Sequence, residues 1–186
     1  MKDNPITIGI DDSTFDLKSD FKTTQLIGVI CQGIRMVNVT RTEIDIDGNN
    51  ATEKIIELVR QNEKHVQYVF THTITFGGFN IVNLEHIYNE VNRPIIAFND
   101  KKVELDSVAN ALIKKFPKGY KEKIKCILDA GNLYQSRIQT AGGISKVYFH
   151  LKGIEISEAN SLIKNSSIDS KLPECLRLAH LIGKLF

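Results

Sequence analysis

Tryptophan is absent from the sequence, cysteine is scarce, and no long apolar run is present. Cys31, Cys126 and Cys175 are far apart and odd in number, and no Cys-x-x-Cys or His/Cys ligand spacing occurs. Neither a disulfide framework nor a zinc finger is therefore expected. A membrane span needs about 18 apolar residues in a row, and a signal peptide needs an apolar core. The sequence shows neither feature, so we expect a cytoplasmic protein that has no membrane partner.

The length and the composition indicate one globular domain. The chain has 186 residues, of which 42% are hydrophobic and 25% charged. This suffices for one sizeable core but not for two, so we predict a single domain over residues 1–186. The formal charge is only +2, yet residues 1–93 carry a net charge of −4 and residues 94–186 carry +6. Such a division fits a metal site beside a phosphate-binding surface, although it also arises by chance.

Residues 6–10 are a short, isoleucine-rich run, which predicts a strand buried on both faces. Two adjacent carboxylates follow it, Asp11 and Asp12. Successive side chains of a strand point to opposite faces, so both acids can face one ligand only if the strand has ended. Two interpretations stay open. The acids cap the following loop together with Ser13, or they bind Mg²⁺ or Mn²⁺ at the end of a core strand.

The remaining elements begin antiparallel and then alternate between strand and helix. Residues 25–31 and 34–41 predict two strands joined by a tight turn. Asn50 is a candidate cap of a helix, with Glu53 three residues later. Beyond it we predict strands at residues 66–70, 94–98, 124–128 and 146–151, and helices at residues 80–91, 105–116, 157–163 and from Pro173 onward. This alternation implies parallel strands joined by right-handed crossovers.

The combination predicts the fold class. An antiparallel start followed by parallel βα units around an acidic strand is the pattern of an α/β, ribonuclease H-like mixed sheet flanked by helices. In such sheets the site residues collect at the strand ends near the central strand. The fold commonly holds two metal ions on carboxylates for phosphodiester hydrolysis.

Four motifs occur in an order that resembles one protein family. They lie at residues 8–13, 47–52, 74–80 and 173–180 and read IGIDDS, DGNNAT, ITFGGFN and PECLRLAH. Together they resemble the archaeal domain-of-unknown-function family 99, also called the endonuclease dU family and related to endonuclease V. The resemblance implies a ribonuclease H-like fold. It also implies a metal-dependent endonuclease that acts in DNA repair on a deaminated base such as deoxyuridine.

The sequence departs from the family pattern at acidic positions. His72 and Thr73 stand where the pattern has Asp-Gly, and Asn50 and Asn83 stand where it has acids. An asparagine keeps the shape of an aspartate but removes the charge that holds a divalent ion. A neutral imidazole at His72 remains able to bind Mn²⁺ or Zn²⁺. These changes keep open a second interpretation, a catalytically impaired nucleic-acid-binding protein of the same fold.

The candidate chemistry lies on three acids, a histidine and a lysine. Asp11, Asp12, Asp47 and Lys101 are the candidate catalytic residues, and Asp11, Asp47 and His72 are the candidate ligands of Mg²⁺ or Mn²⁺, with His72 in place of a usual acid. A cation at Lys101, just beyond a central strand, suits the charge that develops on a scissile phosphate. The residues alone leave Asp47 open, because Asp47 and Gly48 also form a simple turn.

Nucleic acid is the expected partner, and DNA is favoured over RNA. Candidate contacts are Gly77, Gly78, Asn80, Lys102 and Arg177. The two glycines permit positive φ where a strand feeds a helix, so backbone N–H groups can hold a phosphate, although a tight turn explains them equally. Glu174, at the start of the last helix, is expected to reach the central strand end together with Arg177. His180 is expected to be a half-buried histidine that supports the site from behind its ligands.

Residues 114–125 hold six lysines around two aromatic residues, Phe116 and Tyr120. A solvated helix end accounts for them, and so does contact with nucleic-acid phosphates. A third class, an actin-like kinase, also has a Gly-Ile-Asp strand, but it needs two lobes and does not fit this short chain. The endonuclease and the binding protein remain as the two hypotheses, and a metal titration separates them.

Overall fold

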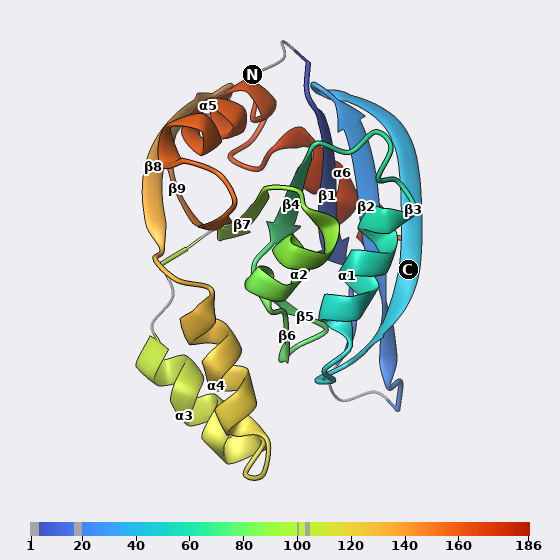
Figure 1. Cartoon of the computed structure of the whole chain (residues 1–186), viewed down its shortest axis with the longest axis vertical. Coiled ribbons are helices and arrows are strands. Elements are labelled where there is room, and N and C mark those ends of the chain that lie inside the picture. The colour runs from blue at the N-terminus through green and yellow to red at the C-terminus, as the bar shows by residue number, and fades with distance from the viewer. Residues whose placement is uncertain (1–3, 17–19, 100, 103–104) are drawn as a thin grey trace.

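The computed structural model describes residues 4–16, 20–99, 101–102 and 105–186. Within these ranges, a seven-stranded sheet has the order β3-β2-β1-β4-β7-β9-β8, and a hairpin of β5 and β6 is separate from it (Figure 1). The strands of the sheet are β1 (Ile6–Asp12), β2 (Thr23–Gln32), β3 (Arg35–Asp45), β4 (Tyr68–His72), β7 (Ile95–Asn99), β8 (Tyr134–Thr140) and β9 (Gly143–Lys152). The hairpin joins β5 (Thr75–Phe76) to β6 (Asn80–Ile81).

The described helices are α1 (Ala51–Arg60), α2 (Leu84–Val91), α3 (Leu105–Lys115), α4 (Tyr120–Asp129), α5 (Ile156–Ser166) and α6 (Glu174–Gly183). Helices α1 and α2 cover one face of the sheet, and α5 and α6 cover the other. Helices α3 and α4 form a pair that projects at the lower end of the molecule (Figure 1). In the part of the chain that the structure describes, no helix is long and apolar enough to cross a membrane.

The strand pairing confirms the predicted fold class. Strand β1 pairs antiparallel with β2 and parallel with β4. Strand β4 pairs parallel with β7, and β9 and β8 extend the sheet in the antiparallel direction. The sheet is therefore mixed, with an antiparallel start, a parallel middle and the acidic strand β1 inside it.

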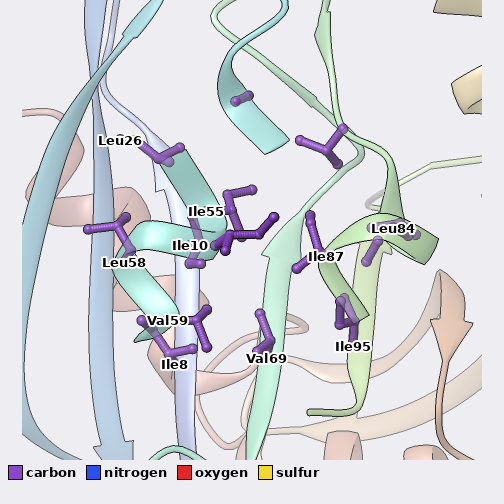
Figure 2. Close-up of a cluster of buried hydrophobic side chains, with 14 of the residues drawn as sticks. Ile8, Ile10, Leu26, Ile55, Leu58, Val59, Val69, Leu84, Ile87 and Ile95 are labelled. Carbon is purple, nitrogen blue, oxygen red and sulfur yellow. The ribbon is translucent and has the colours of Figure 1, made fainter. Parts of the chain in front are cut away.

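The two faces of β1 belong to two different cores. Ile8 and Ile10 point toward α1, where they pack in one cluster with Ile55 (Figure 2). Because side chains alternate along a strand, Gly9 and Asp11 point toward α6 instead. Each fully buried Ile or Leu stabilises the fold by about 1.5–3 kcal/mol relative to an exposed one. The core on the α1 side thus holds β1 in place and leaves the opposite face to build the site.

One predicted strand is wrong. Residues 124–128 form the second half of α4 rather than a strand. A five-residue segment is too short for its periodicity to separate a strand from a helix. In the structure, Lys123 lies on the inner side of α4 and is only 5% exposed, and this buried anchor fits a helix.

One helix start and one missed strand also differ from the prediction. The helix predicted at residues 80–91 begins at Leu84, because Asn80 and Ile81 form β6. Strand β8 is not predicted by the pattern, since only Ile138 and Thr140 of its seven residues are buried. A polar edge strand of this kind gives a weak signal, because its stability comes from pairing with β9.

Helix α6 packs directly on β1 because two glycines remove side chains from the contact. A Cβ atom on Gly9 would lie 2.4 Å from the backbone carbon of Cys175, and a Cβ atom on Gly183 would lie 2.8 Å from the carbonyl oxygen of Asp12. The start of the helix thus matches the middle of the strand, and the end of the helix matches the end of the strand. Helix α6 therefore runs in the same direction as β1, and its last turns reach the acidic strand end.

Candidate metal centre

Three side chains from three elements meet at the carboxyl end of β1. The Oδ2 atom of Asp11 lies 3.0 Å from Nδ1 of His72 in β4 and 2.9 Å from Nδ1 of His180 in α6. One ligand atom from each residue lies within 4.8 Å of those of the other two. The imidazole rings meet edge to face, with centroids 5.7 Å apart. Asp11 is only 3% exposed, so its carboxylate relies on these partners in place of bulk water.

The strand register explains why Asp11 and His72 are neighbours. Ile10 pairs with Thr71 in the parallel ladder between β1 and β4. The next residues, Asp11 and His72, therefore lie side by side, and they share the α6 face because side chains alternate. The metal-site hypothesis requires this proximity.

Thr73 turns the chain immediately after His72. Its φ of 70° lies in the left-handed region, which a β-branched residue seldom adopts. Its N–H donates to the carbonyl oxygen of Phe98 at 2.8 Å, and its hydroxyl donates to the carbonyl oxygen of Thr75 at 2.8 Å. The pattern that the sequence resembles has glycine at this position, and glycine adopts such a φ without strain. The turn ends β4 at His72 and so fixes the direction of the imidazole.

The third member of the cluster comes from the end of α6, not from its start. The expectation that Glu174 and Arg177 reach the end of β1 is wrong, because the helix runs parallel to that strand. These two residues pair with each other through two contacts of 2.7 and 2.8 Å. His180 lies six residues beyond Glu174, about 9 Å farther along the helix axis. It contacts Asp11 directly, rather than supporting the ligands from behind.

Asp12 follows Asp11 directly in the chain and borders the same cavity. Its Oδ2 atom accepts a hydrogen bond of 2.6 Å from the backbone N–H of Gly77, and its own N–H donates to Oδ1 of Asp11 at 3.0 Å. Burial raises the pKa of Asp12 to about 6; the charge of Asp11 adds to this effect, and the Gly77 hydrogen bond opposes it. Asp12 thus connects the β5–β6 turn to the end of β1.

A cavity of about 390 Å³ opens over the cluster. Its walls come from the end of β1 and the loop after it, from the β4–β5 connection, from the β5–β6 turn and from the end of α6. The exposed side chain of Lys184 places a positive charge at the rim. The lining residues are Asp11, Asp12, Ser13, Thr14, Phe15, His72, Thr73, Thr75, Gly78, His180, Gly183 and Lys184.

The donor set of the cluster fits a divalent transition metal. Two imidazole nitrogens and one carboxylate oxygen are the ligand set of many catalytic metal sites that keep open positions. Two arrangements account for the contacts of Oδ2 of Asp11 with the two Nδ1 atoms. Either each Nδ1 carries a proton and donates a hydrogen bond, or one metal ion is bound by all three residues. Imidazole ligands suit Mn²⁺ and Zn²⁺ better than Mg²⁺, which prefers oxygen ligands and bound water. The residues present therefore fit a divalent transition metal such as Mn²⁺ or Zn²⁺ better than they fit Mg²⁺.

Asp47 is not part of this cluster. It has a φ of 58°, and its Oδ1 atom accepts a hydrogen bond of 3.0 Å from the N–H of Phe79. Its Oδ2 atom forms an ion pair with Lys115 at the end of α3. Asp47 lies outside the described lining of the cavity over Asp11. The structure gives it the role of a turn residue, the simpler of its two interpretations, and His180 occupies the third position of the cluster.

Residues 77–80 mainly make hydrogen bonds to neighbouring backbone and side chains within the protein. Gly77 and Gly78 have φ values of 50° and 87°, and Gly78 lines the cavity while Gly77 binds Asp12. Asn80 is 0% exposed, and its side chain accepts from the N–H of Ala51 and donates to the carbonyl oxygen of Asp45 and to Asn50. Asn80 therefore caps α1 from a distance and is too buried for the predicted contact with nucleic acid.

The predicted basic residues lie on two different surfaces. Lys101 and Lys102 are exposed just beyond β7, at the same edge of the sheet as Asp11, but outside the described lining of the cavity. Lys114, Lys118, Lys121 and Lys125 are exposed on the α3–α4 pair. Arg177 is paired with Glu174 and does not line the cavity in the described part of the chain.

Lys123 is the exception in the basic segment. Its Nζ atom donates to the carbonyl oxygens of Gly48 and Phe79 at 2.8 and 2.7 Å and to Oδ1 of Asn49 at 2.7 Å. Burial lowers the pKa of Lys123, while the charge of Asp47 opposes that change. This lysine joins α4 to the loop before α1 and to the β5–β6 hairpin, so it serves the fold rather than a phosphate.

The sequence does not predict that His180 contacts Asp11 or that Lys184 lies at the rim of the cavity, although the spacing of these two residues gives a hint. The importance of His180 and the presence of Lys184 at the rim depend on the direction of α6, which the sequence leaves undetermined. Leu176, His180 and Lys184 are spaced by four residues and therefore lie along one line of the helix surface. A line that begins at a buried leucine and ends at an exposed lysine places the histidine between core and solvent.

Comparisons with known proteins agree with the fold and the motifs. A family model described as endonuclease dU matches residues 6–186. A UPF0215 protein of Methanocaldococcus jannaschii is 35% identical over 188 residues, which cover 100% of this chain and 96% of that protein. A solved structure of a protein of unknown function from Archaeoglobus fulgidus has a TM-score of 0.83 at 30% identity and covers 96% of both chains.

A more distant likeness supports the fold alone. Endonuclease V of Ciona intestinalis, solved in complex with a DNA that contains an inosine followed by a ribo-adenosine, has a TM-score of 0.59 at 12% identity. The match covers 95% of this chain and 82% of that one. It agrees with the ribonuclease H-like arrangement of the sheet.

Proposed function

The chain belongs to the endonuclease dU family, and on this basis we propose that it is a metal-dependent endonuclease acting on DNA that contains a deaminated base such as deoxyuridine. One observation carries the proposal. Asp11, His72 and His180 converge within 4.8 Å at the carboxyl end of β1, in a cavity of about 390 Å³. This is the edge at which ligands bind to sheets of this type.

The residues that would hold the metal ion are Asp11, His72 and His180. A divalent ion there would polarise a phosphate oxygen and supply a hydroxide-like nucleophile at neutral pH. The buried carboxylate of Asp11 provides the negative charge of the set, and the two imidazoles provide neutral donors. We propose Mn²⁺ in preference to Mg²⁺ because of the two nitrogen ligands.

Residues around the cluster would position the phosphate. Lys184 lies at the rim of the cavity, and Lys101 follows β7 at the same edge of the sheet. Both can stabilise charge on a scissile phosphate and its leaving oxygen. Asp12 keeps the β5–β6 turn against the cavity through the N–H of Gly77. The exposed lysines of α3 and α4 offer further contacts for the DNA backbone, independent of sequence.

The second candidate is a nucleic-acid-binding protein of the same fold that has lost catalysis. Its specific support is the state of Asp47, which is held by Lys115 and by the N–H of Phe79. With Asp47 engaged, the cluster has one carboxylate among its three members. A site with so little negative charge would hold a second metal ion weakly.

The experiment is a nicking assay on duplexes with one deoxyuridine or one deoxyinosine, with Mn²⁺ or Mg²⁺. We expect nicking with Mn²⁺ by the wild type and none by Asp11→Asn or His180→Gln. His86→Gln is the matched control, because His86 is exposed and pairs with Glu53 outside the cavity. Equal nicking by wild type and Asp11→Asn would reject the site. Salt-sensitive DNA binding without any nicking would favour the second candidate.

A further inference from the structure

A second cavity adjoins the first on the side of β2 and β3. Its volume is about 730 Å³, and it shares Ser13, Thr14 and Phe15 with the cavity over the Asp11 cluster. Its other lining residues are Asp16, Phe21, Thr23, Thr24, Gln25, Arg41, Glu43 and Phe186. We refer to these eleven residues as the aromatic cavity. A ligand in it would lie next to whatever occupies the Asp11 site.

The cavity exists because α6 ends before the β2–β3 ribbon does. Ile27 and Val29 of β2 are buried in the core beneath α6. Gln25 has the same alternation along β2, so its side chain lies on that same face, beyond the end of the helix. Glu43 lies opposite Gln25 in the antiparallel ladder, and Arg41 lies opposite Ile27. The sheet thus provides a floor of polar and charged side chains where the helix no longer covers it.

The walls of the aromatic cavity are unusually apolar for a surface. Phe21 is 78% exposed and Phe186 is 51% exposed, and both line it together with Phe15. The guanidinium carbon of Arg41 lies 5.0 Å from the centre of the Phe186 ring. Single exposed aromatic side chains are ordinary on a protein surface. Several of them around one cavity are typical of a ligand-binding site.

Hydrogen bonds hold one wall in place. The N–H of Thr14 donates to the carbonyl oxygen of Gly183 at 3.3 Å, and its hydroxyl donates to the carbonyl oxygen of Phe186 at 3.1 Å. The hydroxyl of Ser13 makes a 2.8 Å hydrogen bond with that of Thr24. The start of the loop after β1 is therefore fastened both to β2 and to the segment after α6.

We propose that the aromatic cavity binds one unpaired nucleobase of the strand whose phosphate occupies the Asp11 site. The phosphate position rests on the proposed function, whereas the base contact rests on the cavity itself. Nucleobases stack on phenylalanine rings and on arginine planes whatever their sequence. The amide of Gln25, the carboxylate of Glu43 and the hydroxyl of Thr23 supply donors and acceptors for the edges of the base.

The proposal defines the substrate class. A base that stacks on Phe21 or Phe186 inside the cavity cannot remain paired within a duplex. The chain would therefore act beside a base that is already single-stranded, or one that is turned out of the helix at the cost of its pairing and stacking. Mispaired and damaged bases leave the helix most readily, so this device would favour them without reading a particular sequence.

The test measures binding without metal, so that cleavage plays no part. A single-stranded oligonucleotide with one 2-aminopurine is titrated with protein in EDTA, and its fluorescence reports stacking. The same strand with an abasic site in place of that base is titrated by anisotropy. We expect the wild type to quench the probe and to bind the abasic strand more weakly. Phe186→Ala and Phe21→Ala should each weaken binding of the intact strand by about five- to hundredfold.

Two matched variants keep the result interpretable. Leu128→Ala removes an exposed apolar side chain on α4, outside the described lining of the aromatic cavity, and should leave binding unchanged. Phe186→Trp keeps a stacking surface and should restore binding. Equal affinity for the intact and abasic strands, or no effect of Phe186→Ala and Phe21→Ala, would overturn the proposal.

The failure of this proposal can be told from that of the nuclease. If Phe186→Ala and Phe21→Ala lower the affinity for a fully paired duplex by the same factor as for the single strand, the cavity would contact the DNA backbone rather than a base. That result would also overturn base binding. Base-dependent binding in a protein that never nicks DNA with Mn²⁺ would sustain the aromatic cavity and reject the nuclease.

Discussion

The Nδ1 atom of His180 lies 2.9 Å from the Oδ2 atom of Asp11, although 169 residues separate the two in sequence. This contact depends on the close approach of α6 to β1, which Gly9 and Gly183 permit. It completes a cluster that the register of β1 and β4 starts by placing His72 beside Asp11. The last helix of the chain is thus as necessary to the site as the first strand.

Metal binding is the first property to measure. We expect Mn²⁺ to bind wild-type protein in a calorimetric titration, and Asp11→Asn to bind at least about tenfold more weakly. Loss of an outer partner of a metal ligand already costs about 10–100-fold in affinity, so loss of a direct ligand should cost no less. His86→Gln should match the wild type. Unchanged Mn²⁺ affinity in Asp11→Asn would mean that the three residues form only a hydrogen-bonded group.

Gly9→Ala tests the contact between α6 and β1. The added Cβ would lie 2.4 Å from the backbone of Cys175, and backbone on both sides cannot yield. We expect a loss of about 3–5 kcal/mol in the free energy of unfolding, measured in urea, and weaker Mn²⁺ binding because His180 is displaced. Gly119→Ala is the control, since no atom lies within 4 Å of a Cβ built there. A loss below about 1 kcal/mol for Gly9→Ala would contradict the packing.

The sequence predicts the part of the site that local rules govern. The isoleucine-rich run before Asp11 predicts a core strand, and strand alternation then predicts that Asp11 and Asp12 face opposite sides. The structure confirms the core strand, whereas both carboxylates border the same cavity. His72 is a candidate only through the family resemblance, because the predicted strand ends at residue 70 whereas β4 extends to His72. The core strand itself needs only local periodicity.

Long-range pairing governs the rest, and the sequence does not reveal it. Asp47 has a carboxylate that could bind a metal ion. In the structure it forms an ion pair instead with Lys115, which lies on a helix 68 positions later. The role of His180 depends on the direction of α6. Residues 124–128 are too short a run to show their period, and they belong to a helix whose buried residue is Lys123. In each case a tertiary contact outweighs the local pattern.

Lys123→Met tests the connection between α4 and the loops beside β1. The substitution keeps the length of the side chain but leaves the carbonyl oxygens of Gly48 and Phe79 and the amide of Asn49 without their donor. We expect the free energy of unfolding to fall by about 2–3 kcal/mol, because buried acceptors lose a charged partner. Lys121→Met, on the exposed side of the same helix, should change it by less than about 0.5 kcal/mol. Equal effects would contradict the buried contact.

His150 should make stability depend on pH. Burial lowers its pKa below the ordinary value of 6.5, although its Nδ1 atom contacts the carbonyl oxygen of Gly131 at 3.2 Å. Below pH 6.5 the unfolded chain therefore binds more protons at this residue than the folded chain does, and stability is lost as the pH falls. The effect is at most about 1.4 kcal/mol per pH unit. In urea at pH 7.5 and 5.5 with EDTA, His150→Gln should lose less stability than the wild type. An equal loss would show that other groups account for the dependence.

The final prediction concerns His72, which stands where the family pattern has an aspartate. Because its Nδ1 lies 3.0 Å from Oδ2 of Asp11, His72→Asp would set two carboxylates against each other in a buried place. Without metal, we expect this repulsion to lower the melting temperature. A divalent ion would relieve the repulsion, and a second oxygen ligand would shift the preference from Mn²⁺ toward Mg²⁺. Mg²⁺ at 100 times its Kd should then stabilise the variant by about 2.7 kcal/mol.

His72→Asn is the matched control for this change, because it has the shape of the aspartate without its charge. Thermal unfolding with EDTA, with Mg²⁺ and with Mn²⁺ separates the three proteins. We expect Mg²⁺ to raise the melting temperature of His72→Asp and to leave that of His72→Asn near its value in EDTA, while Mn²⁺ raises that of the wild type. Since the charge at position 72 is the difference between the two variants, equal responses to Mg²⁺ would show that this position does not contribute a metal ligand. In that case His72 would serve only to hold the carboxylate of Asp11 by a hydrogen bond.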